Sequence, residues 1–109
     1  MMNLTNVQRA IKNSMKENEV KQTPLLMLLG AMEELGEAAH VLLKHEQKLC
    51  GYDNEEKFKA ELFDAIGDTT IYLMQLCEEM KWDFEGVAVS VAQRVLLRNQ
   101  GGYKKKQEE

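Results

Sequence analysis

Apolar residues recur every three to four positions along four stretches of the chain, which is the spacing of amphipathic helices. The pattern predicts helices over residues 4–17, 24–48, 55–80 and 84–99. Seven glycines and one proline leave little material for the tight turns of an all-β fold. The sequence therefore predicts an all-α chain whose four helices form a bundle-like protomer.

Start signals support two of these helices. Thr23 has a typical N-cap side chain, and Pro24 fits the first helical position that follows it. Thr5 followed by Gln8 resembles a capping box at the start of the first helix. These signals predict where the first two helices begin.

The connections also carry signals. Gly51 is suited to a left-handed stop after the second helix, and either Asp53 or Asn54 can cap the third. Asp83 is expected to cap the fourth helix. Residues 101–109 are expected to be a flexible basic tail.

The length of 109 residues predicts one domain, residues 1–109, with its core over residues 4–99. A helix over residues 55–80 would be about 39 Å long at 1.5 Å per residue. That is long for so small a domain. We therefore expect this helix to pair with another chain.

The charge balance and the cysteine content exclude several classes of protein. With 14 basic and 18 acidic residues the net charge is −4, which disfavours broad binding to nucleic acid polymers. The longest apolar run, residues 25–29, is too short to span a membrane. No secretory signal is visible, and two cysteines make no disulfide framework. A cytoplasmic location is expected.

Two of the predicted helices each carry a carboxylate cluster among mostly apolar neighbours. At 100° per residue, Glu34 and Glu37 share one face of the second helix, and Glu33 flanks it. The third helix places three acids in one stripe: Glu61, Asp64 and Asp68. Like charges at this spacing repel each other and weaken a helix, so something must compensate them.

A divalent cation would compensate these charges. Oxygen ligands without a cysteine or histidine set favour Mg²⁺ or Mn²⁺ over zinc. The alternative is a solvated acidic face, which paired carboxylates often form. Spacing alone leaves both interpretations open.

The acids also form an ordered pair of motifs. Residues 33–37 read as EExxE, and residues 61–64 read as ExxD after a gap of 23 residues. Gly67 and Asp68 follow, before an apolar helical segment. The pair resembles the MazG-like family of all-α nucleoside triphosphate pyrophosphohydrolases, relatives of the dimeric dUTPases. The resemblance covers roughly residues 25–99.

The resemblance implies Mg²⁺-dependent hydrolysis of a nucleoside triphosphate to a monophosphate and pyrophosphate, as nucleotide-pool housecleaning. It implies that Glu34, Glu37, Glu61 and Asp64 hold the metal, with Mn²⁺ as a possible substitute. Some relatives carry the essential aspartate directly after a glycine. In that register Asp64 and Asp68 act together and Glu61 is peripheral.

The resemblance also implies a dimer or a dimer of dimers with active sites near the subunit interfaces. Glu34 or Glu37 would act as the catalytic base that takes the proton of the attacking water. Substrate phosphates that the metal leaves uncovered need other partners. The candidates are Lys44, Arg94, Arg98 and Asn99. The alternative for each cation is a solvated surface charge.

Two other classes of function stay open. The first is a catalytically silent helical module whose apolar stripe binds a partner protein. The second is a di-iron carboxylate bundle, because Glu37 and His40 form an ExxH pair. Such bundles need a second ExxH, and the third helix has Asp64 at that place. His40 is otherwise expected at the helix surface, or as a partner of a carboxylate.

Overall fold

All the regular secondary structure within residues 2–102 is helical, as predicted. The computed structural model describes residues 2–102, and the predicted tail therefore lies outside the described residues from position 103 onward. Four α-helices are followed by a short π-helical segment: α1 (Leu4–Glu17), α2 (Pro24–Glu46), α3 (Glu55–Glu79), α4 (Phe84–Leu97) and η1 (Arg98–Gly102). None of the described helices is both long enough and apolar enough to cross a membrane.

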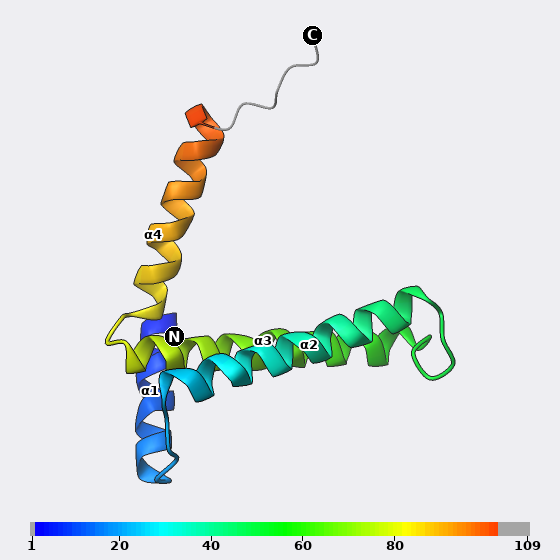
Figure 1. The fold of residues 1–109 in the computed structure, drawn as a ribbon, viewed down its shortest axis with the longest axis horizontal. Helices are drawn as coiled ribbons and strands as arrows, with labels where there is room; N and C mark the ends of the chain where they lie inside the picture. The colour runs from blue at the N-terminus through cyan, green and yellow to red at the C-terminus, as the bar shows by residue number, and fades with distance from the viewer. Residues whose placement is uncertain (1, 103–109) are drawn as a thin grey trace.

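Helices α2 and α3 form a long antiparallel hairpin (Figure 1). Small side chains fill much of its interior, where Ala31, Ala38 and Ala65 are buried. Gly30 faces Tyr72 so closely that a Cβ atom at Gly30 would lie 2.6 Å from Cδ1 and 2.7 Å from Cζ of the ring. The two helices approach closely because these positions carry almost no side chain.

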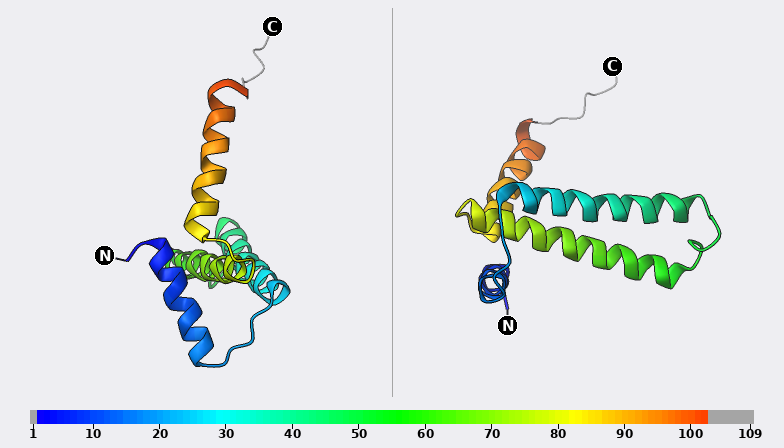
Figure 2. Two further views of the ribbon diagram at one scale, coloured as in Figure 1. Left: turned by 90° about the vertical axis from the view of Figure 1, so that its left-hand side faces the viewer. Right: turned by 60° about the horizontal axis from the view of Figure 1, so that its bottom comes forward.

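Helices α1 and α4 lie at the open end of this hairpin, away from the loop that joins α2 to α3 (Figure 2). Helix α1 crosses α3, and α4 projects away from the hairpin. Among the described residues, only α2 and α3 pack along their lengths. The four predicted helices are confirmed, but within one protomer they are arranged as a hairpin with two flanking helices, not as a closed bundle.

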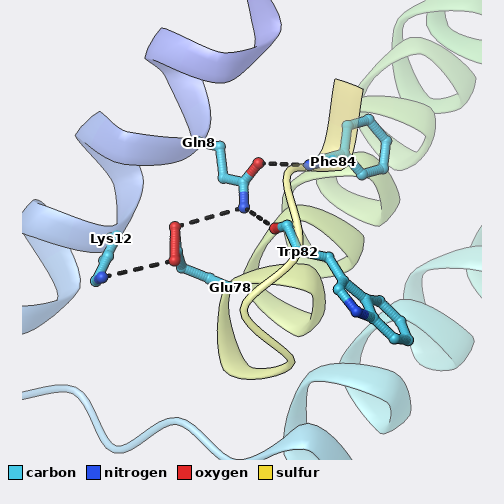
Figure 3. A network of polar contacts seen from close by, with 5 residues as sticks. All are labelled: Gln8, Lys12, Glu78, Trp82 and Phe84. Carbon is cyan, nitrogen blue, oxygen red and sulfur yellow. Dashed lines mark hydrogen bonds and ion pairs between the residues drawn. The ribbon is translucent and has the colours of Figure 1, made fainter. Parts of the chain in front are cut away.

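A buried glutamine attaches α1 to the connection between α3 and α4 (Figure 3). Nε2 of Gln8 donates a hydrogen bond to the backbone oxygen of Trp82 at 2.9 Å, and Phe84 N–H donates to Oε1 of Gln8 at 2.7 Å. Glu78 accepts from the same Nε2 at 3.4 Å and lies 3.6 Å from Nζ of Lys12. One side chain therefore satisfies two backbone groups of the turn that sets the direction of α4.

The predicted capping box at the first helix is wrong. The N-cap is Asn3, whose side chain accepts from Asn6 N–H at 2.8 Å. Thr5 instead donates to Oε2 of Glu85 at 2.9 Å, and Gln8 is occupied by the α3–α4 connection. Both polar groups have partners on distant segments, which local spacing does not reveal.

The other helix ends follow the sequence more closely. Thr23 and Asp83 accept hydrogen bonds from backbone N–H groups as the predicted N-caps of α2 and α4. Asn54 caps α3. Helix α2 ends two residues earlier than predicted because Lys48, with φ of 55°, already has the left-handed conformation. Gly51, with φ of 89°, makes a second left-handed turn inside the loop.

The hairpin also has an exposed apolar face. Leu25, Leu35 and Phe63 are 64%, 61% and 79% exposed, and Met32 and Ile66 are exposed beside them in sequence. At 100° per residue, these side chains project from the side of each helix that is opposite its carboxylate cluster. One side of the hairpin is therefore acidic, and the other is apolar. Among residues 2–102, no other segment covers this apolar side.

Candidate functional site

A cavity of about 570 Å³ lies between α2 and α3 on the acidic side of the hairpin. This volume is within the range of small-molecule sites. The lining residues are Glu33, Glu34, Gly36, Glu37, His40, Val41, Glu61, Asp64, Ala65 and Asp68. All six acids that the sequence analysis singled out therefore line one cavity.

The packing of the hairpin explains this convergence. Ala38 and Ala65 are buried between the helices, so the two backbones lie close together beside the cavity. Glu34 and Glu61 are half-buried on either side, and Glu37 is exposed. Residues three and four apart share one face of a helix, so each helix directs its acids to the same side.

The carboxylate of Glu34 is the most perturbed group in the cavity. Partial removal from solvent raises its pKa above the ordinary value of 4.5, and the negative charges of Glu37 and Asp68 raise it further. A hydrogen bond with Glu37 and the charge of Glu33 act in the same direction. The surroundings of Glu34 therefore favour its protonated form, and a nearby cation would oppose this effect.

The donor set suits a hard divalent cation, because carboxylate oxygens are the ligands that Mg²⁺ and Mn²⁺ prefer. Within residues 2–102, however, no three acid, histidine or cysteine side chains are already grouped closely enough to hold a metal ion. The side chains would have to rotate toward each other to share one. Partly exposed carboxylates on a helix surface have room for such rotation.

Both proposed registers of the second motif remain available. Glu61, Asp64 and Asp68 all line the cavity. Asp68 is the acid of α3 whose charge raises the pKa of Glu34. This electrostatic coupling favours Asp68 as a member of the site.

The predicted phosphate-binding residues are not brought to this cavity within one protomer. Lys44 lies on α2, one helical turn beyond His40, and does not line the cavity. Arg94 and Arg98 line a different cavity of about 420 Å³ on α4, together with Val91 and Leu97. Asn99 lies in η1. Helix α4, which carries Arg94, leaves the hairpin at its open end (Figure 1).

His40, which the sequence analysis places at the helix surface or beside a carboxylate, has a neighbour that the sequence analysis did not identify, Tyr52. His40 lines the cavity, and its Nε2 lies 3.3 Å from the Tyr52 hydroxyl. The two rings meet edge to face, with centroids 5.7 Å apart. The position of His40 one turn after Glu37 was a usable signal, because residues at i and i+3 share a face. Nothing in the local pattern indicated Tyr52, since the loop conformation brings it to His40.

The loop between α2 and α3 is fixed by the other histidine. His45 Nδ1 lies 2.7 Å from the backbone oxygen of Tyr52, and its ring stacks on Phe58 at a centroid distance of 3.9 Å. His45 Nε2 lies 3.2 Å from a carboxylate oxygen of Glu55. These contacts hold Tyr52 beside α2.

Comparison of the chain with protein-family models, with curated proteins and with solved structures gave no match.

Proposed function

We propose that this protein is a Mg²⁺-dependent nucleoside triphosphate pyrophosphohydrolase, with Mn²⁺ as an alternative cofactor. The observation that carries the proposal is the convergence of six carboxylates from two helices on one cavity. The raised pKa of Glu34 supports it, because a divalent cation would relieve the crowding that raises that pKa. The resemblance of residues 33–37 and 61–64 to the MazG-like motifs supplies the reaction class.

In this proposal Glu34 and Glu37 hold the cation from α2, with Asp64 and either Asp68 or Glu61 from α3. When bound, the cation neutralises charge on phosphate oxygens and lowers the pKa of a water molecule. In the proposal Glu37 accepts the proton of the attacking water, and its exposure at the cavity wall supports this role. Val41 and Ala65 form the apolar part of the wall.

The proposal includes self-association through the apolar face of the hairpin. Leu25, Leu35 and Phe63 are 61–79% exposed on this face, and large exposed apolar surfaces often mark interaction sites in soluble proteins. A second copy packed on that face would complete the bundle that one protomer lacks. It is also the source from which the proposal draws the phosphate-binding groups, because Arg94 and Arg98 line a cavity on α4 that is separate from the acidic cavity of their own protomer.

The first experiment is pyrophosphate release from a panel of canonical and modified nucleoside triphosphates, with Mg²⁺ and with EDTA. We expect release that depends on Mg²⁺ and yields a nucleoside monophosphate. Release of orthophosphate, or pyrophosphate release that persists in EDTA, would contradict the proposed reaction.

A pair of substitutions on α2 tests the site itself. Glu37→Gln should abolish turnover while the helical content stays unchanged, because an amide can neither take the proton nor hold the cation as a carboxylate does. Glu46→Gln is the matched control, since Glu46 lies at the end of the same helix and outside the cavity. Wild-type rates for Glu37→Gln would rule out the proposed role.

The apolar face also favours a second candidate, a silent module that binds a partner protein. Thermal unfolding separates the two candidates: Mg²⁺ with a nucleotide should stabilise the pyrophosphohydrolase and leave a silent module unchanged. The di-iron alternative lacks a second histidine at the site, because His45 is bound to the α2–α3 loop and to Glu55.

A further inference from the structure

We propose that His40 donates a hydrogen bond to a phosphate oxygen of the ligand in the acidic cavity, and that Tyr52 positions the imidazole for this role. The inference rests on the proposed function, because it takes a phosphate chain as the occupant. His40 is then a residue that contacts the ligand, and Tyr52 is a positioning residue.

The composition of the cavity wall motivates the role of His40. Of the ten lining side chains, six are carboxylic acids, and three have no polar side-chain group: Gly36, Val41 and Ala65. The remaining one is His40. Ionised carboxylates only accept hydrogen bonds, and so do phosphate oxygens. Within this wall the imidazole is therefore the group that can donate to a phosphate oxygen left uncovered by a cation.

Tyr52 determines which imidazole nitrogen is free to donate. The Tyr52 hydroxyl lies 3.3 Å from Nε2 of His40. If the phenol donates to Nε2, the ring proton is on Nδ1, because neutral imidazole carries one N–H. Among the described residues, the hydrogen bond of His40 is made through Nε2 and none is made through Nδ1. We therefore assign the Nδ1–H group as the donor.

The position of Tyr52 is itself fixed by the loop. His45 Nδ1–H donates to the Tyr52 carbonyl at 2.7 Å, and the His45 ring stacks on Phe58 of α3. Tyr52 also lies beside Val41 and Glu61, which both line the acidic cavity as well. The loop thus connects the end of α2 to the rim of the cavity through one hydroxyl group.

Calorimetric titration tests the contact with two probes in Mg²⁺: inorganic tripolyphosphate and a non-hydrolysable nucleoside triphosphate. His40→Leu should lower the affinity for both probes by about 10- to 100-fold, which is the usual effect of losing a hydrogen bond to a charged acceptor. His40→Asn should retain most of the affinity, because its amide can place a donor near the position of Nδ1. Tyr52→Phe should bind both probes several-fold more weakly than the wild type. Tyr72→Phe, which removes a hydroxyl at the other end of the hairpin, should bind like the wild type.

A spectroscopic measurement tests the positioning role without a ligand. The chain has two histidines, so nitrogen-detected imidazole spectra are simple to assign. The wild type should show His40 with its proton on Nδ1. Tyr52→Phe should shift His40 toward a mixture of tautomers and leave His45 unchanged. An unchanged His40 tautomer in Tyr52→Phe would overturn the role of Tyr52.

The binding results separate the inference about His40 from the proposed function. If wild type binds both probes and His40→Leu binds them equally well, the inference about His40 is wrong and the proposed function stands. If His40→Leu loses only the nucleotide, His40 contacts the base or sugar and the phosphate assignment is overturned. If the wild type binds neither probe, the proposed function fails, and the inference fails with it.

Discussion

The close contact between Gly30 and Tyr72 makes a sharp prediction about the α2–α3 hairpin. A Cβ atom at Gly30 would lie 2.6 Å from Cδ1 and 2.7 Å from Cζ of the Tyr72 ring. Gly36 lies six residues further along the same helix and has open space at the corresponding position. Alanine at these two positions should therefore change the free energy of unfolding in opposite directions.

The magnitudes follow from two opposing effects. Replacing glycine by alanine inside a helix stabilises it by about 0.5–1 kcal/mol through reduced backbone entropy of the unfolded chain. At Gly30 the added methyl group must displace the Tyr72 ring, and overpacking of this kind costs about 1–3 kcal/mol. We expect Gly30→Ala to lower the free energy of unfolding by roughly 1–2 kcal/mol. Gly36→Ala should raise it by up to about 1 kcal/mol.

Urea unfolding followed by circular dichroism measures both changes, provided the m value stays constant across the variants. A double-mutant cycle identifies the cause. Tyr72→Ala removes the ring, so Gly30→Ala should cost far less in that background, with a coupling energy of at least about 1 kcal/mol.

Two results would refute this reasoning. If Gly30→Ala stabilises the protein as much as Gly36→Ala does, the two helices do not approach as closely as described. If the cycle shows no coupling with Tyr72, the contact is not the cause of the loss. A destabilising effect of Gly36→Ala that grows with protein concentration would mean that a second copy covers this position.

Three further predictions follow from other contacts. Gln8→Ala should lower the free energy of unfolding by about 1–3 kcal/mol in urea unfolding, because it removes two hydrogen bonds from a buried side chain to part-buried backbone groups; a loss below about 0.5 kcal/mol would contradict these contacts. In the wild type, protonated Glu34 stabilises the metal-free fold fully below pH 4.5, and this contribution disappears as the pH rises through its raised pKa. Glu34→Gln cannot titrate, so its free energy of unfolding should not show this decrease with rising pH. Equal pH profiles for this variant and the wild type would exclude that effect. Leu35→Lys should shift sedimentation toward monomer, whereas an unchanged sedimentation coefficient would place the interface elsewhere.

The positions of the helices were largely predictable because local chemistry specifies them. The side chains of Thr23 and Asp83 accept hydrogen bonds from free N–H groups at the starts of their helices, and Pro24 has no N–H that needs a partner. These effects act over no more than four residues. The failures occurred where a polar side chain had a distant partner. Thr5 and Gln8 match a local capping pattern, but they bind the α3–α4 connection and the start of α4, about 75 to 80 residues away.

The candidate site was predictable to a similar extent. Helical periodicity placed the acids of each helix on one face, and an antiparallel hairpin with small buried residues then brought the two faces to one cavity. Periodicity cannot specify what the α2–α3 loop does. Tyr52 reaches His40 because Lys48 and Gly51 turn the chain through left-handed conformations, and because His45 holds the loop backbone.

The sequence by itself determined that the chain is helical, where its helices run, and that two of them each carry a carboxylate cluster on one face. These properties depend on backbone propensity and on side-chain spacing along one element. Only the tertiary structure decided that α4 projects from the hairpin, so that Arg94 and Arg98 lie away from the acids. It also decided that no other segment of the described protomer covers the apolar face of the hairpin. Both depend on contacts between segments far apart in the chain, such as that of Gln8 with the α3–α4 connection, and spacing within one helix carries no information about them.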